Sequence, residues 1–178
     1  MAYKNIHQKL IDKCIKGDKR AQFKIYEYYY KAMYNTSYRI IGDEMEAEDV
    51  MQDAFLSAFN NINTYKGEVS FGAWLKKIVV NRSLDALRKQ KVDWVDEEMM
   101  PEFADDNENE ELENIDVQVE QIMDGINKLP EGYRVVLSLY LLEGYDHDEI
   151  GEIMNITSST SRSQFVRARK KLLEMLAN

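Results

Sequence analysis

The sequence predicts an all-α protein made of two small helical domains joined by an acidic linker. Only two prolines and eight glycines occur among its 178 residues, and hydrophobic residues make up 44%, a composition that favours helices. Apolar residues recur at three- and four-residue spacing on both sides of residues 93–120, a stretch with 13 acidic residues and no basic one. We therefore place one domain at residues 1–92, an acidic flexible linker at 93–116 and a second domain at 117–178.

The net charge of −9 conceals an uneven distribution of charge along the chain. Outside residues 93–120 there are 19 acids and 23 bases, so the remainder is positively charged. Its basic residues are concentrated in residues 76–91 and 155–178. Two separate segments are therefore suited to a polyanionic partner, which the overall charge would not suggest.

Three helices are expected before the polar loop of residues 60–70, at residues 3–16, about 19–41 and about 44–62. Gly17 and Gly42 follow the first two helices, as glycine often does, and Asp18 and Asp43 can cap the next two. The second helix is rich in aromatic residues. We expect its stripe of apolar and aromatic residues to pack in the core rather than to stack on nucleic acid. That stripe consists of Phe23, Tyr26, Tyr30, Met33, Tyr34, Ser37 and Ile41.

The third expected helix carries more acidic residues than its N-terminus requires. Glu44 and Glu46 lie in the first turn, where negative charge complements the helix dipole. The dipole does not account for Asp49, Gln52 and Asp53, which fall together on the outer side of the helix. These three residues form a compact acidic patch that is available to a partner.

Residues 71–91 predict an amphipathic helix with a basic outer face. Ser70 can serve as its N-cap, and Phe71, Trp74 and Leu75 begin an apolar stripe at helical spacing. The remaining positions hold six basic residues and one acid, Asp85. Such a helix can pack on a core by one side and offer the other to a polyanion. On this stretch alone, a solvated surface helix remains the alternative.

The C-terminal segment predicts a helix-turn-helix. Asp146 can cap a short helix, Asn155 tolerates the left-handed conformation that the turn needs, and Thr157 or Ser158 can cap a longer helix. That second helix begins with small polar residues and becomes strongly basic, a pattern suited to duplex DNA in the major groove. An αα-hairpin within a helical bundle is the alternative.

Several classes of protein are disfavoured by the composition. The single cysteine, Cys14, excludes an internal disulfide, and two histidines offer few partners for a metal site. No signal peptide or membrane-spanning stretch is apparent, so we expect a cytoplasmic protein. No nucleotide-binding loop or nucleophile–base arrangement is apparent either, so we expect neither an enzyme nor a cofactor.

Taken together, four stretches resemble the extracytoplasmic-function (ECF) class of bacterial RNA polymerase sigma factors. They stand in the order found in that family, on both sides of a variable linker, and they cover most of the chain. The four are EAEDVMQDAFLSAF (46–59), FGAWLKKIVVNRSLDALRKQK (71–91), LPEGYRVVLSLYLLEGYDHDEIGEIMNIT (129–157) and SRSQFVRARKKL (161–172).

The resemblance implies a subunit that binds core RNA polymerase, directs it to promoters and helps to melt the minus-ten element. Its partners would be the clamp of the largest subunit, the flap of the second largest, promoter DNA and an anti-sigma factor. The polymerase-binding residues would be Asp49, Gln52 and Asp53. The residues that bind minus-ten DNA would be Asn60, Asn61, Tyr65, Lys76, Lys77, Asn81, Arg82, Arg88 and Lys89. The residues that bind the minus-thirty-five element would be Ser159, Arg162, Ser163, Gln164, Arg167, Lys170 and Lys171.

Two positions depart from the family pattern. Many members have a branched apolar residue in place of Ser161 and a basic residue in place of Gln164. A glutamine can make a bidentate contact to adenine, so the base preference at this position is open. The acidic residues of the linker either form a solvated spacer or cover the basic helices of the free protein.

Two other functions are alternatives to a sigma factor. A free-standing helix-turn-helix regulator would need only residues 117–178 and would leave the first domain without a role. A helical adaptor for other proteins would explain the acidic patch but not the two basic helices.

Overall fold

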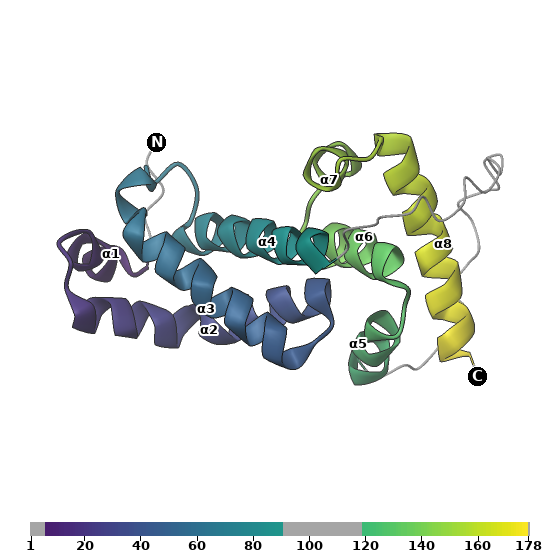
Figure 1. The fold of residues 1–178 in the computed structure, drawn as a ribbon, viewed down its shortest axis with the longest axis horizontal. Coiled ribbons are helices and arrows are strands. Elements are labelled where there is room, and N and C mark those ends of the chain that lie inside the picture. The colour runs from purple at the N-terminus through teal and green to yellow at the C-terminus, as the bar shows by residue number, and fades with distance from the viewer. Residues whose placement is uncertain (1–5, 91–118, 178) are drawn as a thin grey trace.

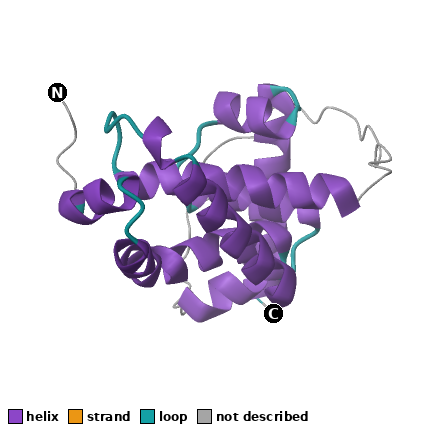
Figure 2. Cartoon of the chain, turned by 60° about the vertical axis from the view of Figure 1, so that its left-hand side comes forward, coloured by secondary structure: helices purple, strands orange, loops and turns teal. Residues whose placement is uncertain are grey.

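The computed structural model describes residues 6–90 and 119–177, and within these ranges the chain is helical (Figure 1). Its helices are α1 (Gln8–Ile15), α2 (Lys19–Ile41), α3 (Glu44–Asn60), the 3₁₀ turn η1 (Ile62–Thr64), α4 (Phe71–Gln90), α5 (Val119–Asn127), α6 (Glu131–Leu141), α7 (His147–Met154) and α8 (Ser158–Leu176). No strand occurs in this part of the chain. The predicted all-α fold is confirmed, and within each of the two described ranges short loops join successive helices (Figure 2).

Side-chain caps determine where several helices begin, as the sequence predicts. Asp18 accepts hydrogen bonds from the backbone N–H groups of Arg20 and Ala21 at the start of α2, and Asp43 accepts one at the start of α3. These bonds satisfy N–H groups that have no partner within the helix. The remaining side-chain caps are Ser70 before α4, Asp146 before α7 and Thr157 before α8.

The helices α1 to α4 enclose one hydrophobic core. At its centre are Ile25, Met51, Phe55, Phe71 and Leu75, none of which is more than 2% exposed. Each comes from an apolar stripe at helical spacing, so the core follows from the pattern that predicts the helices. Its outer parts are aromatic side chains that are partly buried against it.

One expectation about α2 is wrong. Phe23 is 62% exposed and Tyr30 is 45% exposed, although both were expected in the core. The buried stripe of α2 instead runs through Ala21, Ile25 and Met33. Because this stripe is the one that contacts α1, α3 and α4, Phe23 and Tyr30 fall beyond its edge.

A second core joins the two groups of helices directly. Val80, Leu84 and Leu87 of α4 pack with Ile40 of α2 against residues of α6 and α7. The partners from α6 and α7 are Val135, Val136, Leu139 and Ile150. Full burial of such a side chain is worth about 1.5–3 kcal/mol. Figure 1 shows α6 beside the C-terminal end of α4, so the two units are in contact.

Gly42 ends α2 at the point where this contact begins. It adopts a left-handed conformation with φ of 85°, and the guanidinium of Arg134 from α6 lies against it. Nη2 of Arg134 donates hydrogen bonds to the carbonyl oxygens of Ile40 and Ile41, at 3.2 and 3.0 Å. These carbonyls end α2, where the helix dipole favours a cation.

Gly42→Ala is expected to lower the free energy of unfolding by more than Gly17→Ala does. Both glycines have positive φ, so alanine costs about 1–2 kcal/mol at either position. A Cβ at Gly42 would also lie 2.9 Å from Cζ of Arg134, whereas nothing lies within 4 Å of one at Gly17. Urea unfolding of both variants measures the difference. Equal losses would show that Arg134 moves aside without cost.

A third core lies within the second unit. Ile126 of α5, Leu129 and Leu137 pack against Ala168 and Leu172 of α8. Gly151 of α7 is also buried where the chain turns towards α8: a Cβ there would lie 2.9 Å from the backbone oxygen of Ile156. Asn155 has φ of 58°, the left-handed conformation expected of the turn. The predicted helix-turn-helix is therefore formed by α7 and α8.

Candidate functional site

The acidic patch of α3 lies on the surface, as predicted. Asp49, Gln52 and Asp53 are all exposed, and Nε2 of Gln52 donates a hydrogen bond to the carboxylate of Glu48 at 3.2 Å. None of the three contributes to the hydrophobic core of the first unit. Their removal should therefore leave the fold largely intact, while changing what α3 offers to a partner.

Two apolar residues that the sequence reasoning missed lie beside this patch. Met45 is 81% exposed and Leu56 is 62% exposed. With Asp49 and Gln52 they follow the spacing i, i+4, i+7, i+11, which places all four along one side of a helix. That spacing was readable in the sequence. The exposed side of α3 thus combines carboxylates with large apolar side chains that a partner could cover.

In the polar loop before α4, two of the predicted DNA-binding residues make hydrogen bonds within the protein. Nδ2 of Asn61 donates to the carbonyl of Ser57 at 2.9 Å and so satisfies the C-terminal end of α3. The ring of Tyr65 packs on the core, its centroid 5.4 Å from that of Phe71, and its hydroxyl donates to the carbonyl of Val69 at 2.7 Å. Asn60 is exposed. Asn60 is therefore more accessible to a partner than Tyr65.

The predicted DNA-binding residues of α4 fall into two groups. Lys77, Asn81, Arg82 and Lys89 are exposed, and Nη2 of Arg82 donates to the hydroxyl of Ser57 at 3.2 Å. Lys76 and Arg88 behave differently, because each contacts the second unit. The exposed group forms the basic surface expected of this helix.

Arg88 reaches two partners from the end of α4. Its guanidinium forms an ion pair with Asp85, at 3.1 Å, and it donates a hydrogen bond to the carbonyl of Ile153 in α7. The first contact lies within α4 and the second crosses to the other unit. Arg88 is thus exposed to solvent although it also binds Asp85 and the carbonyl of Ile153.

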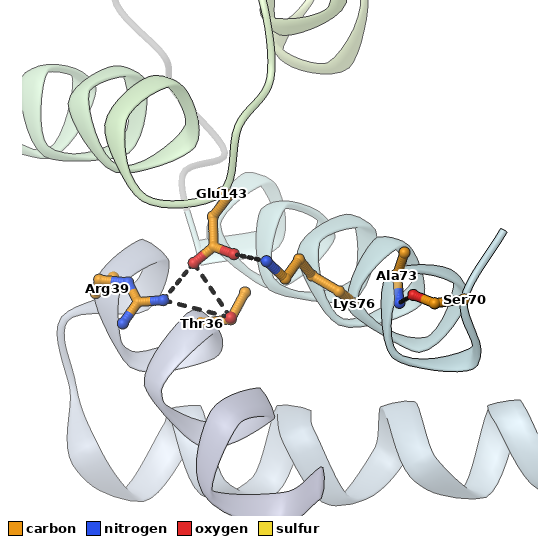
Figure 3. Close-up of polar contacts among 6 residues, drawn as sticks. All are labelled: Thr36, Arg39, Ser70, Ala73, Lys76 and Glu143. Carbon is orange, nitrogen blue, oxygen red and sulfur yellow. Dashed lines mark hydrogen bonds and ion pairs between the residues drawn. The ribbon is translucent and has the colours of Figure 1, made fainter. Parts of the chain in front are cut away.

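Lys76 is part of a charge cluster centred on the buried carboxylate of Glu143 (Figure 3). Nζ of Lys76 lies 2.9 Å from one carboxylate oxygen of Glu143, and Arg39 and Thr36 of α2 donate to the other. The Glu143 side chain is only 1% exposed. Burial alone would raise its pKa, but the hydrogen bonds from Arg39 and Lys76 outweigh burial and lower the pKa below its ordinary value. Glu143 is therefore held as an anion between two cations.

Most of the predicted recognition residues of α8 are on the surface. Ser159, Arg162, Ser163, Lys170 and Lys171 are exposed and Arg167 is half-buried. Gln164 differs: its Oε1 is buried, without a hydrogen-bond partner among the described residues, and it lies near Gly132 of α6. Gln164 therefore faces α6 in this conformation, and a contact with a base would require its side chain to turn outward.

Ser161, one of the two positions at which the family resemblance leads us to expect a different residue, is completely buried. Its hydroxyl lies 2.9 Å from Nδ1 of His147, whose ring stacks on Tyr140 with centroids 4.5 Å apart. Burial, with a contribution from the nearby Arg162, lowers the pKa of His147. The neutral imidazole can accept a hydrogen bond from the serine hydroxyl through Nδ1. A polar contact thus lies between α7 and α8, beside the packing of the His147 ring against Phe165.

Known families match both units of the chain. Residues 25–92 match the family described as Sigma-70 region 2, and residues 119–172 match Sigma-70, region 4. The chain is 32% identical over 179 residues to the ECF RNA polymerase sigma factor SigW of Bacillus subtilis strain 168, which covers 95% of this chain and 96% of that protein. The chain belongs to the ECF class of RNA polymerase sigma factors.

Other relatives agree with this assignment. The ECF RNA polymerase sigma-E factor of Haemophilus influenzae is 29% identical over 182 residues, covering 97% of this sigma factor and 96% of the relative. The solved structure of the sigma factor RpoE of Bartonella quintana, in complex with the anti-sigma factor NepR, has a TM-score of 0.56 at 19% identity. It covers 86% of this chain and 95% of that one. The structure of CnrH in complex with the cytosolic domain of CnrY has a TM-score of 0.53 at 20% identity, covering 94% and 95%. At these identities the structures support the fold alone.

The sigma factor therefore directs RNA polymerase to promoters. Its region 2 contains the acidic patch of α3 and the basic surface of α4, and its region 4 contains the helix-turn-helix. Among the described residues, no group of histidine, cysteine, aspartate or glutamate side chains could hold a metal ion. Within residues 6–90 and 119–177, every helix is too short or too polar to cross a bilayer.

Proposed function

We propose that this sigma factor binds core polymerase through the acidic patch of α3, opens the minus-ten element with the α4 region, and reads the minus-thirty-five element with α8. The observation that carries the proposal is the exposure of Asp49, Gln52 and Asp53 outside the core of region 2. Exposed carboxylates that do not contribute to the core are suited to binding a basic surface of a partner. The clamp of the largest polymerase subunit is the proposed partner of this patch.

The basic surface of α4 supports a role in strand opening. Lys77, Asn81, Arg82 and Lys89 are exposed on a helix that follows the polar loop. Cations bind the phosphates, and a trapped base offsets the few kcal/mol that each unstacked step costs. Asn60 is the loop residue best placed to contact such a base. The side chains that shape the loop, Asn61 and Tyr65, would keep it in register.

The second unit supports recognition of duplex DNA. The N-terminal residues of α8 are small, polar or arginine, and its later turns are basic. The first part of the helix can therefore contact bases while the later turns contact phosphates. The flap of the second largest subunit is the proposed polymerase contact of this unit. Exposed Leu141, at the end of α6, and Leu142, which follows it, offer apolar surface to the flap.

An anti-sigma factor is a further proposed partner. Two solved relatives of this fold were determined with proteins that bind them, one of which is named as an anti-sigma factor. The proposal also takes the protein to be cytoplasmic and to have no catalytic activity of its own. Its task is to place the polymerase on DNA.

Reconstituted transcription tests this function. The purified chain is mixed with core polymerase and run through a gel-filtration column, and the complex is then supplied with a library of promoter fragments. Co-elution with core polymerase and transcripts that begin at a shared pair of sequence elements are expected. Failure to co-elute would overturn the proposed docking, and co-elution without promoter-dependent transcripts would overturn the proposed DNA contacts.

Substitutions in α8 should separate contacts with phosphates from contacts with bases. Replacing Lys170 and Lys171 with alanine is expected to weaken binding to every duplex alike, and to reduce the slope of log affinity against log salt by about 0.9 per lost contact. Arg162→Ala is expected to change which sequence is preferred. Fluorescence anisotropy on duplexes of several sequences, over a range of salt concentrations, measures both effects. If both variants altered sequence preference equally, the proposed docking of α8 would be wrong.

A further inference from the structure

A shallow, open hollow lies on the outer side of α2, near the N-terminal end of the helix. Its volume is about 430 Å³, and it is lined by Lys19, Arg20, Phe23, Lys24 and Glu27. Phe23 is 62% exposed, so a large apolar ring lies in water with three cations and one acid around it. We call this surface the α2 hollow. None of its residues belongs to the proposed contacts with core polymerase or promoter DNA.

The exposed side of α3 offers what the α2 hollow lacks. Leu56 is 62% exposed, and Gln52 and Asp53, which are exposed as well, lie one helical turn before it. We call these three residues the α3 surface. It combines an apolar side chain with negative charge, whereas the α2 hollow combines one with positive charge. Two surfaces that are complementary in both respects are suited to bind each other.

The α2 hollow and the α3 surface cannot meet within one chain. The helices α2 and α3 already pack together in the core of the first unit, where the rings of Tyr26 and Phe55 have centroids 4.9 Å apart. Phe23 and Leu56 point away from that packing and are exposed. A second copy of the chain carries both complementary surfaces. We propose that this sigma factor self-associates, with the α2 hollow of one copy covered by the α3 surface of the next.

The spacing of residues within the two helices fits a parallel crossing. Lys19 and Arg20 lie one turn before Phe23, and Asp53 lies one turn before Leu56. If Phe23 of one copy packs on Leu56 of another with the helices parallel, the two turns that precede them face each other. The two cations then lie beside the carboxylate of Asp53 while the apolar side chains are removed from water.

The acid of the α2 hollow also favours this orientation. Glu27 lies one turn after Phe23, and Asn60 lies one turn after Leu56. In the parallel crossing Glu27 therefore faces a neutral side chain. An antiparallel crossing would instead place Glu27 beside Asp53, and like charges side by side at an interface are unfavourable.

Self-association of this kind uses two different surfaces of each copy. A head-to-tail contact leaves one α2 hollow and one α3 surface free at the ends of the assembly, so further copies can add unless the geometry closes a ring. The average mass is therefore expected to rise with protein concentration beyond that of a dimer.

The contact would also compete with core polymerase, a consequence that rests on the proposed function. The α3 surface contains Gln52 and Asp53, which belong to the patch proposed to bind the clamp. A copy whose α3 surface is covered by another copy cannot use it to bind polymerase. Because the two partners exclude one another, excess core polymerase should dissociate the assembly by mass action.

Single-stranded nucleic acid is the other class of partner that suits an aromatic ring among cations. The second copy is favoured for two reasons. Phe23 lies about 200° around the helix from the buried Ile25, so it faces away from the core on which α4 packs and from the basic surface of α4. The α3 surface also supplies an apolar side chain and a carboxylate at the matching spacing.

Charge reversal on each surface, and on both, tests the inference. The first variant carries Lys19→Glu with Arg20→Glu, and the second carries Gln52→Lys with Asp53→Lys. A third, the swap variant, carries all four substitutions, so opposite charges again face each other. Sedimentation velocity of each full chain over a range of concentrations measures self-association, and circular dichroism checks helicity.

The control is Lys31→Glu with Lys66→Glu, which changes the net charge as the first variant does. Both lysines are exposed and neither lines the α2 hollow. The control should associate almost as the wild type does. The first and second variants should each associate at least tenfold more weakly, because like charges then face each other. An equimolar mixture of these two variants, and the swap variant alone, should regain most of the association.

Phe23→Ser provides a test that does not depend on charge. Phe23 is exposed and lies outside the core of the first unit, so helicity should be retained while self-association falls at least tenfold. The inference is overturned if the wild type stays monomeric at every concentration. It is also overturned if Phe23→Ser associates as the wild type does, or if helical charge variants are not restored by mixing or by the swap.

A fluorescein-labelled single-stranded 12-mer of mixed sequence distinguishes the other partner. A monomeric wild type whose affinity for the 12-mer falls with Phe23→Ser would assign the α2 hollow to nucleic acid and overturn the inference. Self-association is measured without polymerase, so its outcome is separate from the proposed function. Phe23→Ser should still co-elute with core polymerase. Failure of the wild type to co-elute would contradict the proposed function and not the self-association.

Discussion

Reversing Asp49 and Asp53 to lysine is expected to abolish binding to core polymerase while leaving helicity and the melting temperature nearly unchanged. Both carboxylates are exposed and neither belongs to the core of region 2, so the fold has little to lose. A partner surface that is complementary to two anions would instead meet two cations, which is strongly unfavourable at an interface. A loss of affinity on the order of 100-fold or more corresponds to about 2.7 kcal/mol.

A matched control reverses two exposed acids of the other unit, Asp124 and Glu152, and so makes the same change in net charge. This variant should bind core polymerase almost as the wild type does. Surface plasmon resonance with immobilised core polymerase compares the three proteins. Wild-type affinity in the variant of Asp49 and Asp53, or an equal loss in the control, would show that α3 is not the docking surface.

Replacing Asn81 and Arg82 together with alanine is expected to impair promoter opening far more than initial binding of duplex DNA. Both side chains are exposed on α4, on the basic surface that follows the polar loop. Contacts that form only with the separated strands stabilise the open complex without strengthening the closed one. Permanganate reactivity of thymines in the minus-ten region measures opening, and a filter-binding assay at low temperature measures the initial complex.

Ser57→Ala is the control for this experiment. Arg82 donates a hydrogen bond to the Ser57 hydroxyl, so a purely structural Arg82 would be disturbed by this change as well. If Arg82 acts on DNA, Ser57→Ala should leave permanganate reactivity close to that of the wild type. Equal defects in both proteins would show that the role of Arg82 is to hold α4 against α3.

The positions of the helices were readable from local patterns. Asp18, Ser70, Asp146 and Thr157 cap helices because a short polar side chain can reach N–H groups two or three residues ahead. Asn155 adopts the left-handed conformation of the turn for an equally local reason. Capping and turn residues of this kind act on neighbours in the sequence, so their effect does not depend on how the helices pack.

The sequence also predicted part of the exposed surface, because helical spacing is a local pattern. Helical spacing correctly placed the acidic patch of α3 on the outside, and the same spacing contained Met45 and Leu56, which were overlooked. It failed for Phe23 and Tyr30, because the apolar stripe of a helix shows which residues could be buried but not how the helix is rotated against three neighbours. The proposed roles of Asp49, Gln52, Asp53 and of the DNA-binding residues stay predictions. The acidic linker lies outside the described residues.

By itself, the sequence determined the helical class, the caps, the helix-turn-helix and the separation of acidic from basic surfaces. Each of these depends on composition or on residues within about one or two helical turns. Only the tertiary structure decided that Glu143 is buried between Arg39 and Lys76, that Arg134 closes the end of α2, and that Gln164 faces α6. Glu143 lies 104 residues from Arg39 along the chain. The spacing of apolar residues cannot predict a pairing over that distance. Contacts of this kind arise when separate helices pack together, because packing determines which charges leave water and must find a partner.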